Sequence, residues 1–244
     1  MAINLFLFGY QIDVYSLFVY FSILISALIL KYNLYKFKNN LNKYFEYEYL
    51  IITIIAILLG IFGIHLFATF EKGNFQNIFK IDLFSNGANF FGAIFLFFPF
   101  LYLYTFYRKI DFIIISTICS ISIALGSAIG RIGCLISGDG CYGIPTHLPW
   151  GMTFNNGLIP TNQLVHPTPL YEAIIMFLLF IYLQFNLYKK QNYLQILSIF
   201  FIISGIERFI IEFIRINSKY YLLSQAQWLS IILVLVGILI LRKK

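Results

Sequence analysis

The chain has 244 residues, of which 60% are hydrophobic and only 11% are charged, with a formal net charge of +7. Because soluble domains usually carry about 25% charged residues, this composition excludes a soluble globular domain and predicts an integral membrane protein. The basic residues stand in short loops between apolar segments, as orientation signals beside anionic lipid do. We therefore expect the bilayer as a partner and no nucleic acid.

Apolar windows of about 18 to 22 residues predict seven transmembrane helices in one all-α membrane domain covering residues 1–244. The N-terminal sequence MAINLFLFGYQID has no basic region and no small-residue cleavage site, so we expect it to be retained. The predicted helices cover residues 14–31, 49–70, 89–107, 111–130, 168–188, 193–214 and 225–241. The connector at 31–48 has an amphipathic pattern.

The distribution of basic residues predicts the orientation of these helices. With the N-terminus outside, eleven lysines and arginines fall in the inner loops and tail, against five outside. The five outer residues are Lys72, Lys80, Arg131, Arg215 and Lys219. The positive-inside rule then favours an external N-terminus and a cytoplasmic C-terminus. This orientation places the end of the sixth helix and the long segment 131–167 on the external side.

A glycine-rich stretch at 126–143 reads GSAIGRIGCLISGDGCYG. Glycines allow close backbone approach and positive φ, and an arginine at the edge of a bilayer is by default a functional-site candidate. A disulfide between Cys134 and Cys141 is one possibility on an oxidising side, whereas their spacing matches no zinc motif. The proline-rich segment that follows is too polar to span, so we expect surface-lying or re-entrant elements there.

The sixth helix ends in GIERFIIEFIR, which places Arg208 and Glu212 four residues apart on one helical face. Glu207 and Arg215 add a second acid and a second base. Two interpretations are open. The four residues form a structural ion-pair network near the interface, or they belong to a catalytic site.

Other charged and polar residues are expected on the same side of the membrane. Arg131 is one, and the motif HPTPLYEA at the start of the fifth helix contributes His166, Tyr171 and Glu172. Arginine matches the oxygens of a phosphate diester and always stays charged. A carboxylate or imidazole beside it can accept a proton from a nucleophile, and positioned arginines can stabilise a departing phosphate.

Four ordered motifs carry a resemblance to a known family. They are GRIG at 130–133 followed by SGD at 137–139, HPTPLYEA at 166–173, RFIIEFIR at 208–215, and SQAQWLSI at 224–231. In this order they resemble the signatures of bacterial prolipoprotein diacylglyceryl transferase. Val14–Leu17 is similar to the Trp-Tyr-Gly-Leu element of that family, so the resemblance covers most of the chain.

The resemblance implies transfer of a diacylglyceryl group from phosphatidylglycerol to the lipobox cysteine thiol of a secreted prolipoprotein, with release of glycerol phosphate. It implies no metal and no organic cofactor. The expected partners are phosphatidylglycerol and lipobox-containing prolipoproteins. The expected location is the bacterial inner (plasma) membrane, crossed several times.

Site residues follow from the matched motifs. The resemblance implies catalytic roles for Arg131, Arg208, Glu212 and Asp139, the last standing where the family usually has glutamate. The residues it implies for substrate binding are Arg131, Tyr15, Gly133, Gly138, His166, Tyr171, Glu172 and Arg215. For His166 an alternative role is the capping of the fifth helix.

The chain also departs from the family pattern. A candidate base, the histidine of an HGG motif, should fall within residues 87–93, where Phe91 stands in its place and cannot take a proton. The remaining departures are Cys134 for asparagine, Ser204 for tyrosine, His65 for arginine, and one additional residue within 140–143.

Two functions stay open after these departures. The chain is either an active transferase, in which Glu212, Asp139 or the acidity of the incoming thiol covers the missing base, or an inactive or re-purposed relative. Such a relative would bind phospholipid or use another acceptor. A member of an unrelated class, such as a transporter or a seven-helix receptor, is the remaining alternative. A transporter is disfavoured because the sequence shows neither inverted repeats nor broken helices at the midplane.

Overall fold

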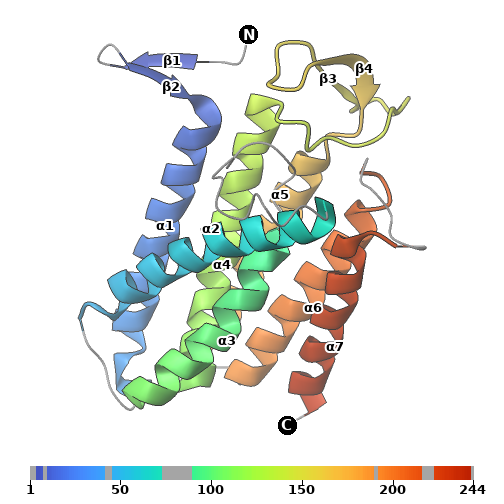
Figure 1. Ribbon diagram of the computed structural model, residues 1–244. Coiled ribbons are helices and arrows are strands. Elements are labelled where there is room, and N and C mark those ends of the chain that lie inside the picture. The colour runs from blue at the N-terminus through green and yellow to red at the C-terminus, as the bar shows by residue number, and fades with distance from the viewer. Residues whose placement is uncertain are drawn as a thin grey trace. The chain divides into compact units, whose positions relative to one another are not determined.

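The computed structural model describes residues 4–7, 10–41, 46–72, 90–189, 192–215 and 223–242. Seven α-helices lie in these ranges (Figure 1): α1 Val14–Lys36, α2 Glu48–Lys72, α3 Phe90–Arg108, α4 Phe112–Ser137, α5 Thr168–Tyr188, α6 Tyr193–Ile211 and α7 Gln225–Arg242. A short 3₁₀ helix, Lys38–Asn40, follows α1. Strands β1 (Asn4–Leu7) and β2 (Tyr10–Asp13) form one antiparallel pair. Strands β3 (Met152–Phe154) and β4 (Thr161–Val165) form another.

The helices have the length and composition of membrane spans. Among the described residues, α1, α4, α5, α6 and α7 are each long and apolar enough to cross a bilayer. The apolar parts of α2 and α3 are shorter, Glu48–Gly63 and Gly92–Arg108. Large apolar side chains such as Leu24 and Leu178 are exposed on the helices, as lipid contact requires. The prediction of an all-α integral membrane protein is confirmed, whereas its orientation stays a prediction.

Each predicted helical range coincides with an observed helix, and the main differences lie at helix ends. Helix α4 continues past residue 130 to Ser137, so Arg131 is a helical residue and its assignment to an external loop was wrong. Residues 31–36, expected in a connector, belong to α1. Helix α6 ends at Ile211, before the predicted 214, and a turn covers residues 212–214.

The chain groups into two compact units. Residues 27–119 form one unit, in which Arg108 Nη2 of α3 lies 2.7 Å from Glu48 Oε1 of α2 and the Tyr104 hydroxyl donates to the other carboxylate oxygen. A Cβ on Gly63 would stand 2.6 Å from the carbonyl oxygen of Gly92, so α2 and α3 cross closely there. That the two units act as one domain stays a prediction.

The other unit, residues 1–26 and 120–244, contains the candidate site. Helices α6 and α7 pack side by side through glycines, because a Cβ on Gly205 would stand 2.9 Å from the Ser230 carbonyl oxygen. At the start of α7, the Gln227 amide donates to Ser224 Oγ while the Ser224 amide donates to Gln227 Oε1. This reciprocal pair is a capping box, which accounts physically for part of the motif SQAQWLSI.

Candidate functional site

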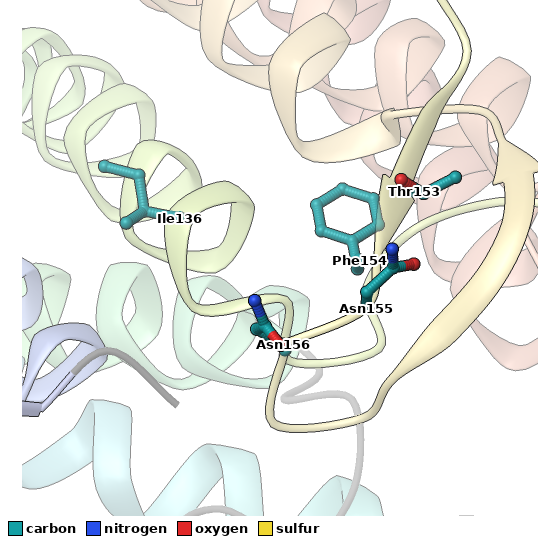
Figure 2. A pocket seen from close by; sticks show the side chains of 6 residues that line it. Ile136, Thr153, Phe154, Asn155 and Asn156 are labelled. Atoms are coloured by element: carbon teal, nitrogen blue, oxygen red, sulfur yellow. The ribbon is translucent and has the colours of Figure 1, made fainter. Parts of the chain in front are cut away.

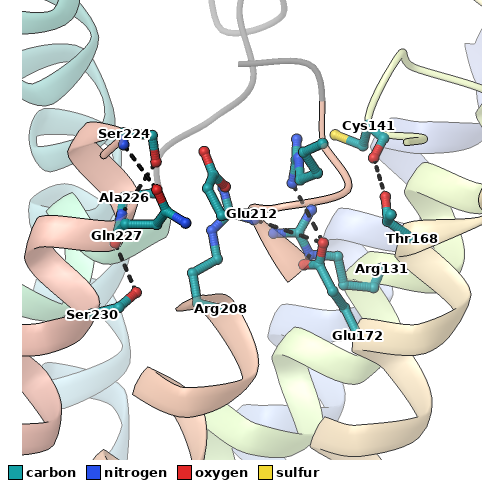
Figure 3. Close-up of polar contacts among 11 residues, drawn as sticks. Arg131, Cys141, Thr168, Glu172, Arg208, Glu212, Ser224, Ala226, Gln227 and Ser230 are labelled. Carbon is teal, nitrogen blue, oxygen red and sulfur yellow. Dashed lines mark hydrogen bonds and ion pairs between the residues drawn. The ribbon is translucent and has the colours of Figure 1, made fainter. Parts of the chain in front are cut away.

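Three arginines and two glutamates meet at one end of α4, α5 and α6 (Figure 3). We call Arg131, Arg208, Arg215, Glu172 and Glu212 the arginine cluster. Arg131 Nε lies 2.5 Å from Glu172 Oε2, while Arg208 Nη1 and Arg215 Nη1 lie 3.6 and 3.4 Å from Glu172 Oε1. Arg208 Nη2 also pairs with Glu212 Oε2 at 3.1 Å. The predicted convergence of these residues is therefore present.

Glu172 is the centre of the cluster. Its side chain is 3% exposed and it pairs with all three arginines, which come from α4, α6 and the segment after α6. Burying so many charges is tolerable only when each has an opposite partner nearby. The geometry makes Glu172 the group that holds the arginines together, in addition to any role in substrate binding.

Backbone bonds fix the segment after α4 against the start of α5 and the end of α6. The Gly143 amide donates to the His166 carbonyl oxygen at 2.8 Å, and the Ile144 amide donates to the Ile214 carbonyl oxygen at 2.8 Å. The Thr168 hydroxyl donates to the Cys141 carbonyl oxygen at 2.5 Å. These bonds place Arg215 beside α5 without relying on side-chain packing alone.

A tight turn follows α4. Gly138 and Gly140 have φ of 57° and 85°, a conformation that favours glycine. Between them, Asp139 Oδ1 accepts a hydrogen bond from the Cys141 amide at 3.0 Å. Asp139 therefore stabilises the turn, and its carboxylate interacts electrostatically with Tyr15 of α1. The structure brings Asp139 and Tyr15 to the same end of α4 as the cluster, where Arg131 also interacts with Tyr15.

His166 and Tyr171 lie at the start of α5. His166 Nδ1 is 3.4 Å from the Tyr171 hydroxyl, which also accepts a hydrogen bond from Trp150 Nε1 at 2.8 Å. The residue at the N-cap of α5 is Pro167, with no side-chain capping bond. The alternative role of His166 as the cap of this helix is therefore wrong. Trp150 was not singled out in the sequence, because its contact depends on the fold of residues 143–166.

Cys134 and Cys141 are both buried free thiols. Their Sγ atoms and a carboxylate oxygen of Asp139 lie within 4.8 Å of one another, a ligand set that could in principle hold a metal ion. However, Arg131 and Arg215 both interact electrostatically with Cys141, and their positive charges oppose a divalent cation there. The arrangement fits a stabilised thiolate better than a metal centre.

The Cys141 thiol should react as an acidic thiol. A hydrogen bond with Cys134, aided by Arg215 and Arg131, lowers the pKa of Cys141 to about 7 despite its burial. The thiolate forms as pH rises through this value, so methylthiolation of Cys141 should reach half its maximal rate near pH 7. Mass spectrometry of the cysteine peptides would measure this.

The Cys134→Ala variant provides the contrast for that experiment. It removes the hydrogen bond, so the midpoint for Cys141 should move up toward the ordinary value of about 8.5. Cys134→Ser keeps a donor and should move the midpoint less. Cys119, which lies within α4 and is 2% exposed against 8% for Cys141, serves as the internal control and should stay unmodified. An unchanged midpoint in Cys134→Ala would contradict the role of the thiol pair.

Two glycines of the signature differ in their surroundings. A Cβ on Gly133 would stand 2.6 Å from Phe18 Cβ of α1, whereas a Cβ on Gly130 would meet nothing within 4 Å. Gly133→Ala should therefore destabilise the protein by about 1 to 3 kcal/mol through overpacking. Gly130→Ala, one turn away in the same helix, should be neutral or slightly stabilising.

Thermal unfolding in one detergent would compare the two alanine variants. Equal melting temperatures would show that α1 can shift away from residue 133 without loss of stability, which would contradict the prediction. The contact with Phe18 also gives Gly133 a packing role, apart from the substrate-binding role expected from the motif. Gly138 is likewise structural, since a Cβ there would stand 2.8 Å from the Gly157 Cα.

A surface pocket of about 270 Å³ lies beside the β3–β4 hairpin (Figure 2). Its lining residues are Ile136, Thr153, Phe154, Asn155, Asn156 and Gly157. None of them is charged and none belongs to the arginine cluster. The pocket therefore adds no chemistry to the candidate site.

The structure describes only some of the positions that depart from the family pattern. The side chains of Phe91 and His65 lie outside the described residues. Ser204 lies in α6, where it is buried and its hydroxyl has no hydrogen-bond partner in the described part of the chain. The buried acid Glu207, one turn later, received no role from the motifs because the matched motif begins at Arg208.

Comparisons with known proteins identify the family of this chain. The family model described as "Prolipoprotein diacylglyceryl transferase" matches residues 2–242. A phosphatidylglycerol–prolipoprotein diacylglyceryl transferase of Clostridium tetani is 31% identical over 239 residues, covering 96% of this chain and 94% of that protein. The enzyme of the same name from Ehrlichia ruminantium (strain Welgevonden) is 34% identical over 190 residues, 71% of each chain. One from Leptospira interrogans is 35% identical over 188 residues, 64% of this chain and 59% of that protein. The chain thus belongs to the prolipoprotein diacylglyceryl transferase family.

Proposed function

We propose that this protein transfers the diacylglyceryl group of phosphatidylglycerol to the lipobox cysteine thiol of prolipoproteins. The activity agrees with the names of its relatives. The observation that carries the proposal is the charge of the arginine cluster. Three buried guanidinium groups face two paired carboxylates, which leaves one positive charge in excess while the Cys141 thiol and Glu207 are both protonated. The phosphate diester of phosphatidylglycerol carries one negative charge and would balance it.

Arg208 is the arginine best prepared to receive the phosphate. It is 7% exposed, and its Nη1 has no hydrogen-bond partner among the described residues, with Glu172 at 3.6 Å as an ion-pair neighbour. Such a buried donor gains a full charge-assisted bond when an anion arrives. Arg131, held by Glu172, would contact a second phosphate oxygen.

The reaction follows from this arrangement. The acceptor sulfur attacks the glyceryl carbon that bears the phosphate, a carbon–sulfur bond forms, and the carbon–oxygen bond to the phosphate breaks. The bonding electrons leave with the phosphate oxygen, so the phosphate changes from one negative charge to two. Arginines fixed in a water-poor site stabilise that added charge without reorganising. The acceptor thiol also loses its proton in this reaction, and that proton needs an acceptor.

The test uses the purified protein with phosphatidylglycerol and a lipobox-cysteine peptide. Both glycerol phosphate release and the mass added to the peptide are followed. Both products together are the expected result. Glycerol phosphate without modified peptide would mean hydrolysis or another acceptor. If neither appears while a relative works in the same assay, the transferase proposal fails. Protection by unconsumed lipid against unfolding would then indicate the lipid-binding alternative.

We also propose the inner (plasma) membrane as the location, with the arginine cluster on its external side. The excess of basic residues in the loops assigned to the inside supports this orientation. Reporter fusions at Lys244 and in the loop at 143–166 would test it. A signal that places the loop fusion in the cytoplasm would contradict the proposed orientation.

A further inference from the structure

Glu207 is a buried acid that the ion pairs of the arginine cluster leave out. Glu207 is only 8% exposed, and its Oε1 has no hydrogen-bond partner in the described part of the chain. By contrast, Glu172 and Glu212 are both ion-paired with arginine. Buried polar atoms are normally hydrogen-bonded, so an exception beside a candidate active site needs an explanation.

The position of Glu207 on α6 directs it toward the cluster. Gly205 faces α7, where a Cβ would contact Ser230 and Val234. At about 100° per residue, Glu207 lies roughly 200° further round the helix and so faces away from α7. Its electrostatic interactions are with Glu172 of α5, Arg131 of α4, and Arg208 and Arg215. The carboxyl group therefore belongs to the same site.

A second atom on that side of α6 also lacks a partner. The Ser204 hydroxyl, three residues before Glu207, is buried and has no hydrogen-bond partner among the described residues. Residues three apart on a helix are neighbours on its surface. Two neighbouring polar groups without partners form a surface that a polar ligand can complete.

The charges of the site indicate which form of Glu207 fits the reaction. With Glu207 neutral, the three arginines and two paired glutamates leave one positive charge, and the bound phosphate diester cancels it. When the carbon–oxygen bond breaks, the phosphate gains a second negative charge. A proton passed from Glu207 at that moment keeps the phosphate at one negative charge and moves the second charge to the Glu207 carboxylate. That carboxylate interacts with Arg131, Arg208 and Arg215.

We propose that neutral Glu207 donates a hydrogen bond to the lipid phosphate and passes its proton to the departing glycerol phosphate. This rests on the transferase function proposed above. The carbon–sulfur bond forms, the carbon–oxygen bond breaks with its electron pair on the phosphate oxygen, and the Glu207 proton joins the phosphate. The alkylated sulfur, which still carries the thiol proton, then passes that proton to the Glu207 carboxylate, so the net reaction moves one proton from the thiol to glycerol phosphate.

The experiment compares Glu207→Gln with Glu207→Leu in the purified protein. Glutamine keeps a hydrogen-bond donor but has no acidic proton. Its kcat should fall by about 10² to 10⁴-fold, while the affinity for phosphatidylglycerol, measured by thermal protection, should stay within about threefold of the wild type. Leucine should lose lipid affinity as well as rate. Glu46→Gln removes an exposed carboxylate and is the matched control.

The outcomes separate this proposal from the one on which it rests. If the wild type makes neither product, the transferase function fails. If the wild type is active and Glu207→Gln keeps at least half its kcat, proton donation by Glu207 is overturned. Should the glutamine variant not fold, Glu207→Asp and Glu207→Asn replace it. The aspartate variant should then be the faster of the two, and equal rates would overturn the proposal.

Discussion

Glu172→Gln is expected to lower the free energy of unfolding by about 3 to 5 kcal/mol, because it removes one partner from buried ion pairs. Three guanidinium groups share this carboxylate, and glutamine cannot neutralise them. Arg131 should lose the most favourable interaction, since it makes the shortest contact to Glu172. Thermal unfolding in detergent, together with the yield of folded protein, would measure the loss.

The matched control for Glu172→Gln is Glu46→Gln, which removes an exposed carboxylate from the other compact unit. Its melting temperature should hardly change. A double variant, Glu172→Gln with Arg131→Gln, should be less destabilised than the sum of the single variants, since it removes both charges of the pair. Strict additivity would show that the Arg131–Glu172 contact carries no coupling energy.

Arg208→Lys is expected to reduce kcat by about 10² to 10³-fold, the range typical of losing one preorganised donor to a developing negative charge. Lysine keeps the positive charge but not the planar fork, which can bond Glu212 and a phosphate oxygen at once. The Arg208→Lys variant should lose less stability than Arg208→Ala, because Glu212 keeps a cationic partner. Initial rates of glycerol phosphate release and peptide modification would give kcat and KM separately.

Arg242→Ala is the control for the Arg208 variants. Arg242 is exposed at the end of α7 and makes no contact with the cluster among the contacts described. Its kcat should equal that of the wild type. If Arg208→Lys retained wild-type kcat with only a raised KM, Arg208 would bind ground state and transition state equally, and its assigned part in stabilising the leaving phosphate would be wrong.

The helices could be predicted because their cause is local. Long apolar windows bounded by charges or prolines specify where each helix lies, and all seven predicted ranges coincide with observed helices. The end of α4 could not be predicted in the same way. The predicted apolar window ended at residue 130, before Arg131, whereas the helix continues to Ser137 and its Gly133 packs against Phe18 of α1. Such long-range packing leaves no mark in the local pattern.

The sequence predicted which residues belong to the candidate site, but not how these residues are arranged. Matched motifs named Arg131, Glu172 and Arg208 as members. That Glu172 would hold three arginines depends on the meeting of segments about forty residues apart, which no spacing rule supplies. Glu207, in contrast, received no role from the matched motifs. Adjacent residues on a helix do not face each other, so the sequence indicates no partner for Glu207 in Arg208. Only the structure shows that its Oε1 is buried without a hydrogen-bond partner among the described residues.

The main-chain bonds around Gly143 and Ile144 also bear on how far related sequences can diverge. Because amides and carbonyls make these bonds, the side chains of Ile144 and Ile214 can change while the backbone arrangement that positions Arg215 persists. Position 143 is the exception, since a Cβ there would stand 2.5 Å from the Ile214 carbonyl oxygen. Among relatives that keep this backbone arrangement, we expect glycine at this one place and wide variation at its neighbours.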